Sequence, residues 1–195
     1  RWVTQNSTET MPVSNPATEQ KIGRIMLGNG TDVDRAVTAA LTAFEEFSQT
    51  SKAQRLSLLL RLKLVTEARF EDLAQAMRLE MGAPISMARS DQADAAVGHL
   101  QGFIDALEKL EEQITLASGD VLVREPIGVC GLITPWNWPM NQIVLKVVPA
   151  LATGSCCILK PSEHTPISAM IYAEIIDEAG YPPGVFNLVN GDGPT

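Results

Sequence analysis

The sequence predicts an α/β protein in which several helices precede the first half of a doubly wound parallel sheet. Two observations carry this prediction. Apolar residues recur at helical spacing through most of residues 31–114, and short apolar runs alternate with helical segments after Pro126. Before these, the first 30 residues contain turn residues such as Asn15 and Pro16, which predicts an extended, turn-rich arm.

Two helical regions are expected over residues 31–81. The first starts at Thr31, which resembles a capping box together with Asp34 three residues later. The second starts near Ser51 and ends before Gly82, because glycine is favoured just past a helix C-terminus.

A third helical region is expected from Ile85, with an apolar seam that extends to Ile114. Three glutamates fall off this seam and are expected on a solvated face: Glu108, Glu111 and Glu112. Polar and apolar residues then alternate over residues 120–125, which predicts a half-exposed strand.

The part after Pro126 predicts a strand-helix-strand-helix-strand order. Strands are expected at residues 128–134, 155–160 and 185–189, and helices at 139–153 and 166–179. The connections are long enough for parallel crossovers, which makes this half of a Rossmann-like sheet with strands buried on both faces. A sheet of three strands has an open edge, so the sequence looks truncated.

Composition and charge exclude several classes of protein. The net charge of −8 and the pI of about 4.8 argue against a nucleic-acid partner, because an acidic surface repels phosphates. The longest apolar run, near residues 143–153, is too short for a membrane span. An odd cysteine number that includes two adjacent cysteines, without a secretory signal, predicts a cytoplasmic protein.

The cysteines and histidines are not expected to do chemistry. Cys130, Cys156 and Cys157 lie inside predicted buried strands, and reactive thiols need exposed, electropositive sites. His99 and His164 have no metal-ligand partner at useful spacing, so no metal site is predicted.

Ligands of open α/β sheets bind beyond the carboxyl ends of the strands, and three loops qualify here. In the first, Pro135 and Pro139 bracket a stiff loop in which Trp136 and Trp138 could wall a flat ring. Asn137 between them offers neutral N–H donors that suit an oxyanion. The alternative is that Asn137 only closes a turn.

The second loop contains Lys160, Ser162 and Glu163. A carboxylate can accept hydrogen bonds from both hydroxyls of a ribose and would repel a 2′-phosphate, which favours NAD over NADP. The alternatives are a surface Lys–Glu pair, and a capping role for Ser162 or Thr165 at the next helix.

The third loop, residues 190–193, contains two glycines that would let the backbone approach a phosphate. Asp192 would repel a phosphate unless it points away. No G-x-G-x-x-G motif follows the first strand, so the standard dinucleotide fingerprint is absent.

Three motifs closely resemble the aldehyde dehydrogenase superfamily: GVCGLITPWNWP, PALATGSCCILKPSEHTP and EAGYPPGVFNLVNGDGP. Weaker matches upstream are SNPATEQKIG, DVDRAVTAALTAF and residues 80–84. The resemblance implies three segments: an arm and helices of the cofactor domain at 1–116, an oligomerisation strand at 117–126, and the NAD-binding unit at 127–195.

The resemblance also implies roles for individual residues. Asn137 would hold the oxyanion of a thiohemiacetal, and Lys146 would take part in a proton relay. The remaining assignments concern the cofactor: Ile133, Thr134, Pro135 and Trp136 line it, Lys160 and Glu163 in the Lys-Pro-Ser-Glu motif with Ser162 bind the adenosine ribose, and Gly191 lies near the adenine.

By this resemblance, the whole enzyme would oxidise an aldehyde to an acid through a covalent thioester, with NAD, as a dimer or tetramer. The nucleophilic Cys and the general-base Glu of the family would follow residue 195, so we expect the chain alone to be inactive. The alternatives are a non-catalytic binding or assembly module, and a relative that reduces acyl phosphates or thioesters.

Overall fold

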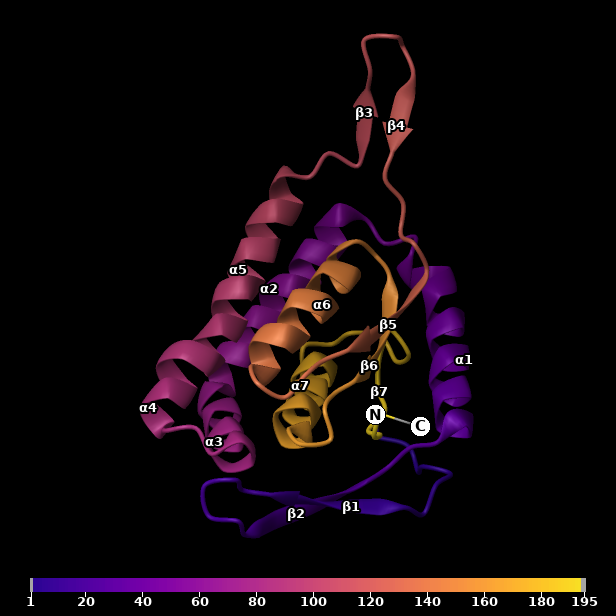
Figure 1. Cartoon of the computed structure of the whole chain (residues 1–195). Helices are drawn as coiled ribbons and strands as arrows, with labels where there is room; N and C mark the ends of the chain where they lie inside the picture. The colour runs from indigo at the N-terminus through magenta and orange to yellow at the C-terminus, as the bar shows by residue number, and fades with distance from the viewer. Residues whose placement is uncertain (1, 194–195) are drawn as a thin grey trace.

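The computed structural model describes residues 2–193 and confirms the α/β fold (Figure 1). A three-stranded parallel sheet in the order β5-β6-β7 forms its centre. Two crossover helices connect these strands and pack on one face of the sheet, and α1 covers the other face (Figure 1). These elements are β5 (Val129–Ile133), α6 (Pro139–Ala152), β6 (Cys156–Lys160), α7 (Pro166–Glu178), β7 (Phe186–Leu188) and α1 (Gly30–Phe47).

A further layer of helices packs outside α6 and α7. It consists of α2 (Lys52–Ala68), α3 (Phe70–Met81), the short α4 (Ile85–Met87), a π-helical turn (Ala88–Ala93) and α5 (Asp94–Lys109). The second predicted helical region is therefore two helices that meet at Arg69. The third ends at Lys109, and Ile114, expected on its apolar seam, lies instead in a strand.

The central strand β6 is buried on both faces, as predicted. Its residues Cys156, Cys157 and Leu159 have no exposed surface, because α1 and α6 cover it from opposite sides. For β5 the same prediction is wrong. This strand lies at the edge of the sheet, and Ile133 at its end is 72% exposed.

The N-terminus of α1 shows that its predicted capping box lies two residues too late. Asn29 is the N-cap: its side chain accepts the Asp32 N–H at 3.2 Å, and the Asp32 carboxylate accepts the Asn29 N–H at 3.1 Å. The sequence offers two overlapping capping pairs, Asn29 with Asp32 and Thr31 with Asp34. The Asp32 carboxylate also accepts the Asn6 N–H at 2.8 Å, so a contact with the arm favours the earlier pair.

Two antiparallel hairpins lie outside the sheet. The arm, predicted only as extended, pairs β1 (Thr10–Ser14) with β2 (Lys21–Met26). The second hairpin pairs β3 (Gln113–Thr115) with β4 (Val121–Val123) and projects from the body of the molecule (Figure 1). All three residues of β4 are exposed, whereas half-exposure was predicted.

A buried arginine ties α2 to the C-terminal end of α6. Arg55 is 4% exposed, and its Nε donates to the Ala152 carbonyl at 2.9 Å. The same guanidinium donates to the Thr50 carbonyl and pairs with Glu112. Glu112, expected on a solvated face, is 40% exposed, and its carboxylate also neutralises the buried charge of Arg55.

Candidate active site

The three predicted loops all start at the carboxyl ends of the three sheet strands. Because β5, β6 and β7 are parallel, their carboxyl ends lie together. The Thr134 N–H donates to the Lys160 carbonyl at 3.3 Å, and the Val189 N–H donates to the Leu159 carbonyl at 3.0 Å. These bonds fix the starting point of each loop relative to its neighbour.

Lys160 joins the second loop to the third. Its Nζ donates to the Gly191 carbonyl at 2.8 Å and lies 3.6 Å from Glu163 Oε2. The two side chains are 26% and 24% exposed, so one ammonium and one carboxylate face each other at the surface of the strand ends. A hydroxyl-rich ligand there would meet both donors and acceptors.

Ser162 has a different place from Lys160 and Glu163. Its side chain is buried, and its Oγ accepts the His164 N–H at 3.2 Å. This bond closes the turn that contains Glu163, so Ser162 shapes the loop from inside.

The third loop is pinned to the segment before α1. The Gly28 N–H donates to the Asn190 carbonyl at 2.6 Å, and a Cβ on Gly28 would lie 2.6 Å from Val189 Cγ1. Only glycine permits this approach. Gly191 is buried beside it.

The first loop is open to solvent. Asn137 and Pro135 are exposed, Trp136 is 55% exposed, and Trp138 is half-buried at the N-cap of α6. Thr134, at 4% exposed, anchors the loop to the sheet.

Lys146 lies farther along α6. It follows Pro139 by two turns, which is about 10 Å along the helix axis. Within residues 2–193 no hydrogen bond joins Lys146 to Asn137. The structure thus brings Lys160, Glu163 and Gly191 together and leaves Asn137 and Lys146 unconnected.

The cysteines have the environment of core residues. Burial raises the pKa of Cys156 to about 11 and raises the pKa of Cys157 further, while Cys130 is half-buried. His99 Nε2 lies 2.6 Å from Asn141 Oδ1, a contact between α5 and α6. Residues 2–193 contain no group of His, Cys, Asp and Glu that could hold a metal ion, and no helix there is long and apolar enough to cross a bilayer.

Glu80 is a buried residue near these loops that sequence reasoning missed. It lies in the last turn of α3, and its carboxylate accepts the N–H of Ile167 at 2.6 Å and of Ser168 at 3.1 Å. Neither Ser162 nor Thr165 caps α7 with its side chain, so the alternative that one of them caps this helix is wrong. One sequence signal could have drawn attention to Glu80. It lies in the last turn of a helix, where an acidic side chain opposes the helix dipole.

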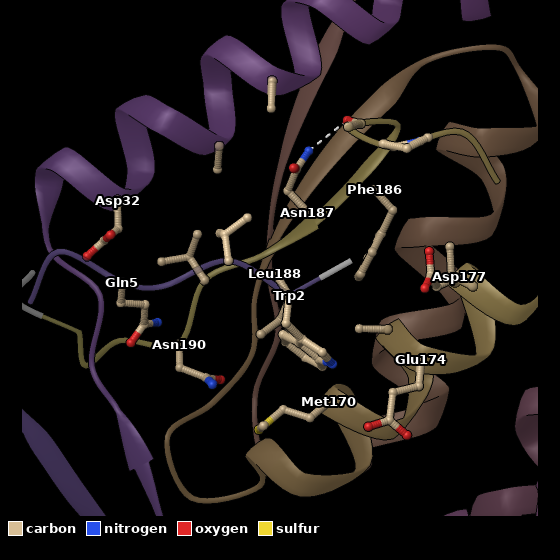
Figure 2. A pocket seen from close by; sticks show the side chains of 18 of the residues that line it. Trp2, Gln5, Asp32, Met170, Glu174, Asp177, Phe186, Asn187, Leu188 and Asn190 are labelled. Carbon is tan, nitrogen blue, oxygen red and sulfur yellow. Dashed lines mark hydrogen bonds between the residues drawn. The ribbon is translucent and has the colours of Figure 1, made fainter.

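A large cavity borders the third loop at Asn190 and lies between the N-terminal arm, α1, α7 and β7 (Figure 2). Its volume is about 920 Å³. Trp2, Met170 and Leu188 contribute to its lining, together with the side chains of Gln5 and Asn190 (Figure 2). The amide oxygens of these two side chains have no hydrogen-bond partner among residues 2–193. None of the predicted site residues lines this cavity.

The fold and the loops at its strand ends define a Rossmann-like α/β unit. The chain belongs to the aldehyde dehydrogenase family, whose model matches residues 2–195. It is 50% identical to 3-succinoylsemialdehyde-pyridine dehydrogenase of a Pseudomonas species, over 100% of this chain and 41% of that protein.

Two solved structures share the fold closely. Aldehyde dehydrogenase from Bartonella henselae is 44% identical with a TM-score of 0.98, over 100% of this chain and 42% of that one. Aldehyde dehydrogenase C of Pseudomonas syringae, a C291A mutant with NAD⁺ and octanal, is 47% identical with a TM-score of 0.97, over 100% of this chain and 40% of that one. The chain thus spans about two fifths of the length of these relatives.

Proposed function

We propose that this chain is the amino-terminal part of an NAD-dependent aldehyde dehydrogenase that oxidises an aldehyde to a carboxylic acid. The observation that carries the proposal is the cluster of Lys160, Glu163 and Gly191 at the carboxyl ends of β6 and β7. Family membership and the NAD⁺ bound by a close structural neighbour support it.

The residues at the strand ends fit the adenosine ribose of NAD. Glu163 accepts hydrogen bonds from the ribose hydroxyls and Lys160 donates, while the buried Gly191 leaves room for the adenine end. The Glu163 carboxylate repels a 2′-phosphate, so we propose NAD rather than NADP. Ile133, Thr134, Pro135 and Trp136 line the remainder of the cofactor.

The first loop supplies the chain's own contribution to chemistry. NAD, when bound, accepts a hydride from the substrate carbon. The exposed Asn137 amide donates a hydrogen bond to the oxyanion that forms on the aldehyde oxygen, and Lys146 assists proton movement. The nucleophilic Cys and the general-base Glu are supplied by the rest of the enzyme.

We further propose that the enzyme is a cytoplasmic homo-oligomer, a dimer or tetramer. The free cysteines agree with a reducing compartment. The exposed hairpin of β3 and β4 supplies an apolar contact surface between subunits.

The cofactor domain, as we propose it, consists of two parts. These are the arm and helices of residues 1–116 and the unit of residues 127–195.

Replacement of Glu163 by Gln tests the cofactor assignment in the full-length protein. We expect about tenfold weaker NAD binding, because a charge-assisted acceptor is lost, together with reduced discrimination against NADP. Isothermal titration of both dinucleotides measures this. The matched control is Glu108→Gln on the exposed face of α5, and unchanged NAD/NADP selectivity in Glu163→Gln would place the specificity elsewhere.

A further inference from the structure

We propose that Glu80 is a positioning residue for the ribose-binding loop, and that it acts by holding the first turn of α7. The inference rests on the proposed function, because it assigns the loop of Lys160 to Glu163 to the adenosine ribose. Glu80 itself touches neither cofactor nor substrate in this assignment.

Three donors converge on the Glu80 carboxylate. The backbone N–H groups of Ile167 and Ser168 donate to its two oxygens at 2.6 and 3.1 Å, and the Ser168 hydroxyl donates to Oε1 as well. The Glu80 side chain is 2% exposed, so these bonds are shielded from water. A helix N-terminus normally takes such bonds from a local cap, but Thr165 makes none with its side chain.

The ribose-binding loop lies between two fixed points. At its start, the Lys160 carbonyl is held by the Thr134 N–H in the sheet. At its end, Glu80 holds Ile167 and Ser168. Glu163 lies midway between these points, so the direction of its carboxylate depends on both of them.

The position of Glu80 is set in turn by the end of α3. Gly82 ends this helix with a φ of +68°. A Cβ there would lie 3.0 Å from Pro16 Cγ and 3.1 Å from the Ala17 nitrogen, so the turn of the N-terminal hairpin packs directly against the helix end. Segments far apart in the sequence therefore determine the geometry of the loop.

The test compares Glu80→Gln with the wild type in the full-length protein at pH 8. The amide offers one acceptor oxygen to three donors and places an NH₂ against a backbone N–H. We expect the Kd values of NAD and of AMP to rise about five- to tenfold, while the Kd of NMN and kcat at saturating NAD stay within about twofold. Ser168→Ala removes one donor and should raise the Kd of NAD by about twofold.

Glu71→Gln is the matched control. Glu71 is a carboxylate of the same helix as Glu80, but it pairs with Arg89 at the surface. We expect this variant to leave the Kd of AMP unchanged.

The outcomes separate the two proposals. Suppose that the wild type binds NAD, and that folded Glu80→Gln binds NAD and AMP with the same Kd values as the wild type. The proposed role of Glu80 is then overturned. The same holds if Glu71→Gln weakens AMP binding as strongly, or if Glu80→Gln weakens the binding of NMN as much as that of AMP. A wild type that does not bind NAD would overturn the proposed function and this inference with it.

Discussion

The three cysteines differ in how far solvent reaches them. Cys156 and Cys157 have no exposed surface in the central strand, whereas Cys130 in the edge strand is partly exposed. Burial disfavours the thiolate and so raises the pKa of Cys156 to about 11. A thiol in such a place is a packing group.

We therefore expect thiol reagents to modify at most Cys130 in the native 195-residue chain at pH 8. Reaction with DTNB, followed by mass spectrometry of the labelled peptides, measures this. All three thiols should react in 6 M guanidinium chloride, which serves as the control. Rapid native labelling at Cys156 or Cys157 would contradict the buried environment.

At Asn137 the prediction concerns the transition state. In the full-length enzyme, Asn137→Ala should lower kcat by about 10²–10³, because one oxyanion donor is lost. NAD affinity should change little, since Asn137 precedes α6 and lies outside the cluster of Lys160 and Glu163. Steady-state kinetics together with NAD titration separate the two effects, and an unchanged kcat would remove Asn137 from the oxyanion site.

At the scale of elements, the buried Glu80 carboxylate joins α3 to α7. Burial raises the pKa of Glu80 from 4.5 to about 7, although its three hydrogen bonds act in the opposite direction. Between these pH values the folded state keeps a proton that the unfolded state releases. The stabilisation that the raised pKa of Glu80 gives the folded state is complete below pH 4.5 and is lost as the pH rises through 7.

Urea unfolding of wild type and Glu80→Gln at pH 5 and pH 8 tests this linkage. The stability advantage of the wild type over the variant should be larger at pH 5, by up to about 3 kcal/mol. Glu67→Gln, which alters an exposed pair with Lys63, is the control and should show no such pH dependence. A difference that is equal at both pH values would mean that Glu80 does not titrate in this range.

For the whole molecule, the projecting hairpin is a surface that the body of the chain does not cover (Figure 1). Val121, Leu122 and Val123 are 55, 40 and 51% exposed. In the full-length protein, Leu122→Glu together with Val123→Asp should shift the oligomer to smaller species, because charges would be buried at the contact. Light scattering coupled to size-exclusion chromatography measures the mass.

The control for the hairpin variant is Leu64→Glu. Leu64 is 65% exposed on α2, so it tests whether any charge placed on an exposed apolar position has the same effect. We expect the oligomer of this variant to keep its mass. An unchanged mass in the hairpin variant would exclude β4 from the subunit contact.

Much of the candidate site was predictable because its residues follow recognisable strands. Periodicity located β5, β6 and β7, and the rule that ligands bind at strand carboxyl ends selected the loops with Asn137 and Glu163. Weaker local signals failed: two overlapping capping pairs near Asn29 could not be distinguished, and the end of α5 was placed too late.

The sequence by itself determined the order of helices and strands and the chemistry available in each loop, because periodicity and turn residues are local properties. Only the tertiary structure decided which distant groups meet. Glu80 caps a helix 87 positions away, Arg55 pairs with Glu112 57 positions away, and Lys160 binds the loop of Gly191. Such contacts depend on how whole elements pack, and no local pattern records that packing.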